Sequence, residues 1–343
     1  MMELQITWFI LWGVLWAVYF MLDGFVMGAG ILHNLIGKSD GDKRVMINTI
    51  GPIWEGNEVW LVTAGGVTFA AFPTTYALMF SYLYSALFIL LCALIVRGVS
   101  YEFRSKEDHP LWRKGWDTAI TLGNFLPALL FGVAFGNIFE GLPMDSTGYH
   151  GSLLSLLNPY GLLTGLLFVS LFAVHGALYL TVKTTGELSR RSQAVADKLW
   201  PGLLLVAVAF LVYTNFATRL YDNYLAHPLL MVVPLLAVVF LLWIKIFSAM
   251  GKPLAAFASS SLTILMVVGT AMTGLFPNLI PSSIDPASSL TLYNSSSSRY
   301  TLKIMLLVVG VFVPIIIGYK IWVYRIFRAP VSEDEVLADK QAY

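Results

Sequence analysis

The sequence predicts an all-α integral membrane protein, with nine transmembrane helices arranged as two four-helix bundles and one peripheral helix. Three observations lead to this fold class. The 343 residues are 57% hydrophobic and 12% charged, whereas soluble domains carry about 25% charged residues. Nine apolar stretches are long enough to cross a bilayer. Lys and Arg gather in alternate connections between these stretches, which is typical of multi-pass membrane proteins.

The apolar stretches cover most of the chain. A hydrocarbon core about 30 Å thick requires about 20 helical residues for each crossing. In chain order the expected spans are 6–29, 52–72, 76–97, 117–139, 159–183, 200–220, 228–248, 257–277 and 302–326. The first three are the least sharply bounded, because Gly, Pro and acidic residues interrupt them.

Lys and Arg predict which side of the membrane each connection faces. If the N-terminus is outside, eighteen of the 21 Lys and Arg residues are cytoplasmic, Lys340 in the tail among them. Only Arg219, Arg299 and Lys303 then fall outside. Eight or ten helices would put basic connections on both sides. The first residues, M-M-E-L-Q, lack the basic segment of a signal peptide, so we expect the first span to be retained.

A short internal similarity divides the chain into halves. Y-F-M-L-D-G-F-V-M-G in the first span aligns with L-F-A-V-H-G-A-L-Y-L in the fifth, which matches Asp23 with His175. The match is short, and chance is the alternative to a true repeat. The expected organisation is a first bundle at 1–139, an outer loop at 140–158, a second bundle at 159–277, an outer loop at 278–301, a ninth helix at 302–326 and a cytoplasmic tail at 327–343.

Composition and motifs exclude several other functions. The net charge is +1 without a basic patch in the sequence, so membrane lipid is an expected partner and nucleic acid is not. Cys92 is the only cysteine, which excludes an intramolecular disulfide and a cysteine metal cluster. The sequence has no P-loop, no G-x-G-x-x-G after a strand, no C-x-x-C and no H-E-x-x-H. It therefore does not support ATP hydrolysis, dinucleotide binding or zinc chemistry.

Acidic residues in the first two spans are the main candidates for function. Asp23 lies in M-L-D-G-F-V-M-G, and Glu55 and Glu58 lie in G-P-I-W-E-G-N-E-V-W-L. Acids inside membrane segments usually face a protein interior or an ion path, because an ionised carboxylate is unfavourable in hydrocarbon. We expect Asp23 and Glu55 at similar depth near the cytoplasmic side, where they could pass protons inward. Glu58 lies on the same helix face as Glu55 and is a secondary candidate.

Each acid also has a structural alternative. Asp23 could make a hydrogen bond beside a Gly-rich helix contact. Glu55 follows Pro52 in a first helical turn, where an acid interacts favourably with the helix dipole. Glu58 could face lipid headgroups.

Other polar residues at the spans are assigned more modest roles. His175 is the only histidine at clear membrane depth, so a bis-histidine haem site has no second ligand there. For His175 a packed and hydrogen-bonded side chain, a member of the proton path and a haem ligand opposite a methionine all stay open. Arg97, Asp117 and the segment R-G-V-S-Y-E-F-R-S-K are interpreted as a snorkelling, ion-paired surface. Three asparagines are interpreted as helix-bridging groups: Asn57, Asn124 and Asn137.

Several segments resemble subunit II of the cytochrome bd-type quinol oxidases. These segments are L-D-G-F-V-M-G-A-G-I-L, I-G-P-I-W-E-G-N-E-V-W-L-V-T-A-G-G, F-R-S-K, G-V-A-F-G-N, L-L-N-P-Y-G-L-L and P-S-S. They occur in the family's order from about residue 10 to about residue 325. The G-x-x-W-[DE]-G-N-x-V-W stretch is the most specific of them.

The resemblance implies one subunit of a respiratory quinol:oxygen oxidoreductase in a bacterial or archaeal cell (inner) membrane. The distribution of Lys and Arg predicts that the N-terminus is outside and the C-terminus cytoplasmic. The resemblance further implies a similarly folded partner, subunit I, which ligates haem b and haem d, while this chain ligates none. The complex would oxidise quinol and reduce O2 to water. Some members hold a structural quinone in this subunit; the sequence decides neither that quinone nor a small accessory subunit.

The resemblance also implies a role for the acids. The family residues that match Asp23 and Glu55 belong to a cytoplasmic proton path. The family often has Asp at the position of Glu55, and a carboxylate is kept here. Some members carry a second acid where this chain has Val26, so a role that needs that acid is in doubt.

A stand-alone proton- or cation-coupled secondary transporter is the alternative from another functional class. Internal repeats and Gly-interrupted helices suit transporters, whose coupling sites lie near the bilayer midplane. The acids are expected near one membrane face, which favours the oxidase subunit.

Overall fold

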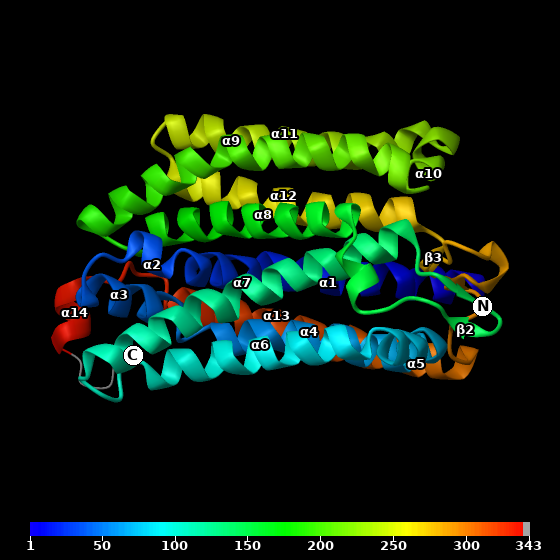
Figure 1. Ribbon diagram of the computed structural model, residues 1–343, viewed down its shortest axis with the longest axis horizontal. Coiled ribbons are helices and arrows are strands. Elements are labelled where there is room, and N and C mark those ends of the chain that lie inside the picture. The colour runs from blue at the N-terminus through cyan, green and yellow to red at the C-terminus, as the bar shows by residue number, and fades with distance from the viewer. Residues whose placement is uncertain (339–343) are drawn as a thin grey trace.

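The computed structural model describes residues 1–338 and consists of long helices that run side by side (Figure 1). Within this part of the chain, eight helices are long and apolar enough to cross a membrane. They are α1 (Met2–Ile31), α6 (Tyr84–Phe103), α7 (Pro110–Glu140), α8 (Pro159–Lys183), α9 (Gly186–Ala217), α11 (Val232–Ala249, extended by the 3-10 helix η2 at Pro228–Met231), α12 (Pro253–Leu275) and α13 (Arg299–Ile326).

The chain bends sharply just after the second predicted span, 52–72. Helix α4 (Trp54–Ala71) and helix α5 (Pro73–Tyr82) are bent by 119° relative to one another. Pro73 begins α5, where its missing N–H leaves no hydrogen bond unmade. The predicted third span, 76–97, is wrong in its boundaries, because it joins most of α5 to α6 (Tyr84–Phe103), although the two helices are separated at Leu83. With the bent pair counted as one span, residues 1–338 hold up to nine spans.

Helix α1 packs at the centre of the protein against α4, α7, α8 and α12. Its closest approach is to α8, where a Cβ on Gly28 would lie only 1.8 Å from the carbonyl oxygen of Phe172. A Cβ on Gly176 would lie 2.3 Å from the backbone nitrogen of Ala29. These two glycines therefore allow the backbones of α1 and α8 to touch.

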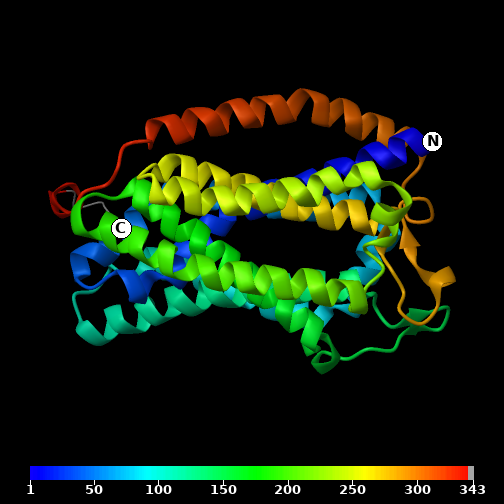
Figure 2. The ribbon, with the colours of Figure 1, turned by 90° about the horizontal axis from the view of Figure 1, so that it is seen from above.

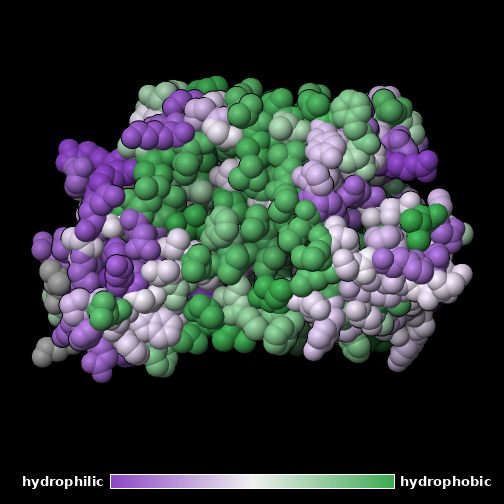
Figure 3. Space-filling model, in the orientation of Figure 1, coloured by the Kyte–Doolittle hydropathy of each residue, from purple (hydrophilic) through white to green (hydrophobic). Residues whose placement is uncertain are grey.

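Helix α13 lies along one edge of the helical body (Figure 2). The 18-residue apolar window by which it qualifies as a span has no buried residue. Figure 3 shows an apolar band across the middle of the molecule, with hydrophilic residues at both ends. A band of this kind is what the hydrocarbon core of a bilayer requires.

Short elements occupy the two ends. One end carries α2 (His33–Ile36), α3 (Asp40–Ile50) and α14 (Glu333–Ala338) (Figure 1). The other end carries the strand pairs β1 (Met144–Asp145) with β2 (Gly148–Tyr149) and β3 (Asn278–Ile280) with β4 (Leu290–Thr291), together with α10 (Asp222–Ala226), η1 (Leu154–Leu157) and η3 (Pro286–Ser288). The predicted outer loops 140–158 and 278–301 thus meet at the same end, joined by a bridge between Leu142 and Ser282. Of the predicted tail, residues 339–343, including Lys340, lie outside the described residues.

Candidate functional site

Asp23 forms a buried, bidentate ion pair with Arg97. The Nη2 atom of Arg97 lies 2.5 Å from Oδ1 of Asp23, and Nη1 lies 2.7 Å from Oδ2. Both side chains are 0% exposed. Two parallel hydrogen bonds between opposite charges are the geometry that best compensates burial of both. The pair therefore joins α1 to α6 in the interior.

The position of Arg97 corrects the sequence-based interpretation. Arg97 does not belong to a snorkelling surface, because α6 continues to Phe103 and leaves Arg97 well inside the helix. Gly123 of α7 permits this burial: a Cβ there would lie 2.9 Å from the backbone of Arg97. An arginine inside an otherwise apolar run was the available signal that the sequence analysis missed.

Glu58 is the second acid at this arginine. Its Oε1 atom lies 3.8 Å from Nη1 of Arg97, and its side chain is 28% exposed. That oxygen is itself buried and has no hydrogen-bond partner among the described residues. Glu55, one turn earlier on α4, is exposed. The structure thus places Glu58 beside the buried pair and Glu55 nearer the surface.

Asn57 fixes the helix that carries both glutamates. Its side-chain nitrogen donates to the carbonyl oxygen of Leu22 in α1 at 2.8 Å. Its side-chain oxygen accepts from the hydroxyl of Tyr324 in α13 at 2.9 Å. Asn57 therefore bridges three helices, as the sequence analysis expected for this residue.

His175 lies elsewhere in the interior and uses both ring nitrogens. Nδ1 lies 2.6 Å from the hydroxyl of Ser260 in α12, and Nε2 lies 3.0 Å from the carbonyl oxygen of Met21 in α1. The ring stacks on Phe257 with centroids 4.8 Å apart. These contacts hold α8 between α1 and α12, so a lone pair is not free for a metal.

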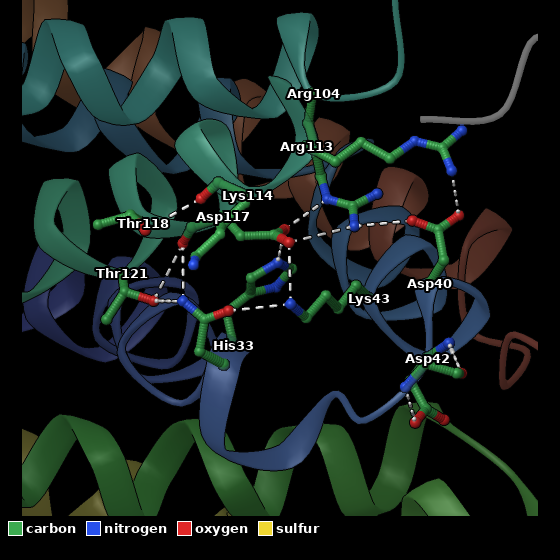
Figure 4. A network of polar contacts seen from close by, with 12 residues as sticks. His33, Asp40, Asp42, Lys43, Arg104, Arg113, Lys114, Asp117, Thr118 and Thr121 are labelled. Carbon is green, nitrogen blue, oxygen red and sulfur yellow. Dashed lines mark hydrogen bonds and ion pairs between the residues drawn. The ribbon is translucent and has the colours of Figure 1, made fainter. Parts of the chain in front are cut away.

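A second polar network closes the end of the helical body near α2 and α3 (Figure 4). The carboxylate of Asp117 accepts from Nε2 of His33 at 2.7 Å, Nζ of Lys43 at 2.8 Å and Nε of Arg104 at 2.5 Å. Asp117 is 5% exposed and Arg104 is 1% exposed. This part of the predicted ion-paired surface is therefore a buried network, because α2 and α3 cover it.

His33 enters that network as a neutral group. Burial lowers the pKa of His33 by more than its hydrogen bond to Asp117 raises it. A neutral imidazole donates one N–H, and here Nε2 is the nitrogen that faces Asp117. His33 thus satisfies the carboxylate without adding a positive charge.

Two apolar cavities lie between the long helices. One has a volume of about 110 Å³, and the other is a groove of about 800 Å³ beside α1 and α12. The smaller cavity is lined chiefly by aromatic and aliphatic side chains, among them Phe20, Phe135, Phe168, Phe210 and Leu241. Residues 1–338 contain no group of three or more His, Cys, Asp or Glu side chains that could hold a metal ion.

Comparisons with known proteins cover almost the whole chain. Residues 4–327 match the family model described as cytochrome bd terminal oxidase subunit II. Cytochrome bd-I ubiquinol oxidase subunit 2 of Escherichia coli strain K12 is 37% identical over 96% of each chain. Cytochrome bd ubiquinol oxidase subunit 2 of Bacillus subtilis strain 168 is 35% identical, with 98% of this chain and 99% of the relative covered. The fold is similar to a chain in the structure of bd oxidase from Geobacillus thermodenitrificans, with a TM-score of 0.79, 17% identity and coverage of 95% of this chain and 98% of that chain.

Proposed function

Since the chain belongs to the family of cytochrome bd terminal oxidase subunit II, we propose that its buried Arg97 cluster forms part of the proton path of a membrane quinol oxidase. The chain is a multi-pass membrane subunit of a respiratory oxidoreductase of the cytochrome bd type. The family assignment sets aside the stand-alone transporter. The partner is a subunit I, and quinol and O2 are the substrates of the complex.

The observation that carries the proton path is the position of Glu58. Its side chain is half-buried, and its buried Oε1 atom lies 3.8 Å from Arg97. Glu58 therefore lies between the buried pair of Asp23 and Arg97 and the surface of the protein. Reduction of O2 to water consumes protons, and a relay requires groups that gain and lose them. We assign the entry of the path to Glu55 and the relay to Glu58.

Asp23 has a different role in this proposal. Protonating Asp23 would leave Arg97 as an uncompensated buried charge, which is strongly unfavourable. We therefore assign Asp23 the task of positioning Arg97 beside Glu58, rather than carrying each proton itself. This refines the expectation from the sequence, in which Asp23 and Glu55 were the carriers.

Turnover of the assembled complex tests the path. Glu58→Gln preserves size and hydrogen bonding but cannot carry a proton, so we expect quinol oxidation to slow by about tenfold or more. Haem absorbance and the ratio of the subunits should stay unchanged. The control is Glu187→Gln, which alters an acid on α9 whose side chain is 65% exposed. Full turnover of a haem-loaded Glu58→Gln complex would contradict the proposal.

We propose that the partner subunit ligates the haems. The fit of this chain to a haem is poor, because His175 is the histidine inside a span and both of its ring nitrogens have partners. The other histidines lie in short elements or loops at the ends of the helices: His33, His109, His150 and His227. No step of the mechanism in this chain therefore runs through a haem.

A structural quinone fits this chain better than a haem does. The cavity of about 110 Å³ is lined by aromatic and aliphatic side chains, which suits part of an isoprenoid chain. We propose that the cavity accepts such a tail. Replacing Ala237, which lines the cavity, with Phe should lower the quinone extracted per complex, while unchanged extraction would refute the site.

The nine-span topology, with two four-helix bundles and a cytoplasmic C-terminus, is proposed from the distribution of Lys and Arg. The bundles would be α1, α4, α6 and α7 in one half and α8, α9, α11 and α12 in the other, with α13 peripheral. A tag inserted within 285–298 should be accessible from outside intact cells. A cytoplasmic tag in this loop would contradict the topology.

A further inference from the structure

A basic cavity opens where α2, α3 and the first turn of α7 meet, within the network drawn in Figure 4. Its volume is about 520 Å³. Five cationic and two anionic side chains line it, which leaves three positive charges in excess. They are Lys38, Lys43, Arg104, Arg113 and Lys114 against Asp40 and Asp117. The neutral His33 does not change this balance, whereas Asp108, which does not line the cavity, pairs with Arg113 and reduces the excess to two.

Several donors at the cavity have no acceptor within residues 1–338. Arg104 is 1% exposed and uses Nε and Nη2 on Asp117 and Asp40, but its buried Nη1 has no partner. No dashed line leads from that third nitrogen in Figure 4. Lys38 and Lys114 are exposed, and neither forms an ion pair with a described residue. The cavity thus has a buried donor at its wall and two free cations at its edge.

Such a donor set suits an anion with several oxygens. Guanidinium and ammonium groups make their shortest and strongest hydrogen bonds to carboxylate and phosphate. The first turn of α7, which begins at Pro110, adds the positive end of a long helix to the same cavity. A phosphate group would satisfy Arg104 and the two lysines together.

The surroundings point to a lipid as the source of that phosphate. Leu35 and Leu111 are next in sequence to residues that line the cavity and are 53% and 72% exposed. On the same turns of α7, Trp112 and Trp116 pack with ring centroids 5.6 Å apart. Tryptophan gathers at the membrane–water interface, and basic pockets between helices on the cytoplasmic side bind anionic headgroups. The cavity therefore lies where a headgroup would sit with its acyl chains on the apolar band.

We propose that this cavity is a binding site for the phosphate of an anionic membrane lipid. The headgroup phosphate contacts Arg104, Lys38 and Lys114, and the acyl chains lie against the exposed leucines. The bound lipid ties α2 and α3 to α7 at the end of the helical body. This site is separate from the Arg97 cluster and does not depend on the proposed proton path.

Lipid retention by the purified whole complex tests the proposal. Wild-type complex, a Lys38→Gln, Lys114→Gln variant and a control are placed in nanodiscs of phosphatidylcholine with a small fraction of phosphatidylglycerol. The control, Lys198→Gln with Lys252→Gln, removes two exposed lysines that do not line the cavity. Native mass spectrometry then counts the phosphatidylglycerol that stays bound after detergent release.

The expected result is a loss of retained phosphatidylglycerol of about tenfold in the cavity variant and almost none in the control. Equal losses in both would show only non-specific surface attraction and would overturn the site. A second arm adds millimolar inorganic phosphate to wild-type complex. If phosphate displaces the lipid completely, the cavity takes a soluble anion and the lipid source is refuted; if the lipid stays, the source is supported.

Discussion

Arg97 of α6 donates to both carboxylate oxygens of Asp23 in α1, and both side chains are fully buried. The same guanidinium approaches Glu58 of α4. One arginine therefore connects three helices. Of its two acidic partners, Asp23 and Glu58, only Glu58 has access to the surface.

Breaking the buried pair from one side should destabilise the protein. Asp23→Asn leaves Arg97 without its counter-charge, and we expect a loss of about 3–5 kcal/mol. Asp23→Asn with Arg97→Gln removes both charges and should recover much of the loss, because the cost comes from the unpaired ion. Thermal unfolding of the complex measures both variants. If the loss of stability in the double variant equals the sum of the losses in Asp23→Asn alone and Arg97→Gln alone, the two side chains are not energetically coupled.

His175 should not be required for haem binding by the complex. Both of its ring nitrogens have partners in the chain, so we expect His175→Ala to retain every haem absorption band. The variant should instead unfold at lower temperature, since it removes two interhelical hydrogen bonds and the stacking on Phe257. Loss of one haem band from a fully assembled complex would contradict this expectation.

The contact between α1 and α8 should reject even a methyl group. Gly28→Ala would place a Cβ 1.8 Å from the carbonyl oxygen of Phe172, and the helices would have to separate. We expect a loss of about 1–3 kcal/mol, typical of overpacking. Gly202→Ala is the matched control, because nothing lies within 4 Å of a Cβ there. Equal stability of the two variants would show that the helices do not meet so closely.

The network around Asp117 should weaken in mild acid through His33. Burial lowers the pKa of His33 from its usual 6.5, so below that value the unfolded chain binds the proton more readily than the folded protein. Stability from this group is therefore complete above about pH 6.5 and decreases as the pH falls towards the folded pKa. Unfolding temperatures from about pH 8 to about pH 5 should show the decrease in wild type.

His33→Gln supplies the control for that measurement. Glutamine can donate a hydrogen bond to Asp117 but does not titrate, so its unfolding temperature should vary less over the same range. An identical pH dependence in both proteins would assign the effect to other groups.

Much of the helix layout was predictable. The predicted span 159–183 coincides with α8 (Pro159–Lys183), and the predicted end of the ninth span is the end of α13. These helices are marked by uninterrupted apolar runs with polar or proline boundaries. Residues 76–97 were assigned to one span because apolar composition continues from α5 into α6 across Leu83, and hydropathy does not register where one helix ends and the next begins.

The sequence by itself determined the class of protein, the family and the presence of acids in the first two membrane helices, because composition and motifs are properties of the linear chain. Only the tertiary structure decided which groups face each other. Arg97 is buried because α6 continues beyond it to Phe103. Glu58 lies nearer to Arg97 than Glu55 does, because α4 turns the face with Glu58 towards α6. His33 and Asp117 are distant in sequence and meet only after α2 folds over α7. The rotation of each helix about its axis and its exact ends are set by packing against its neighbours, and no single segment of the sequence contains that information.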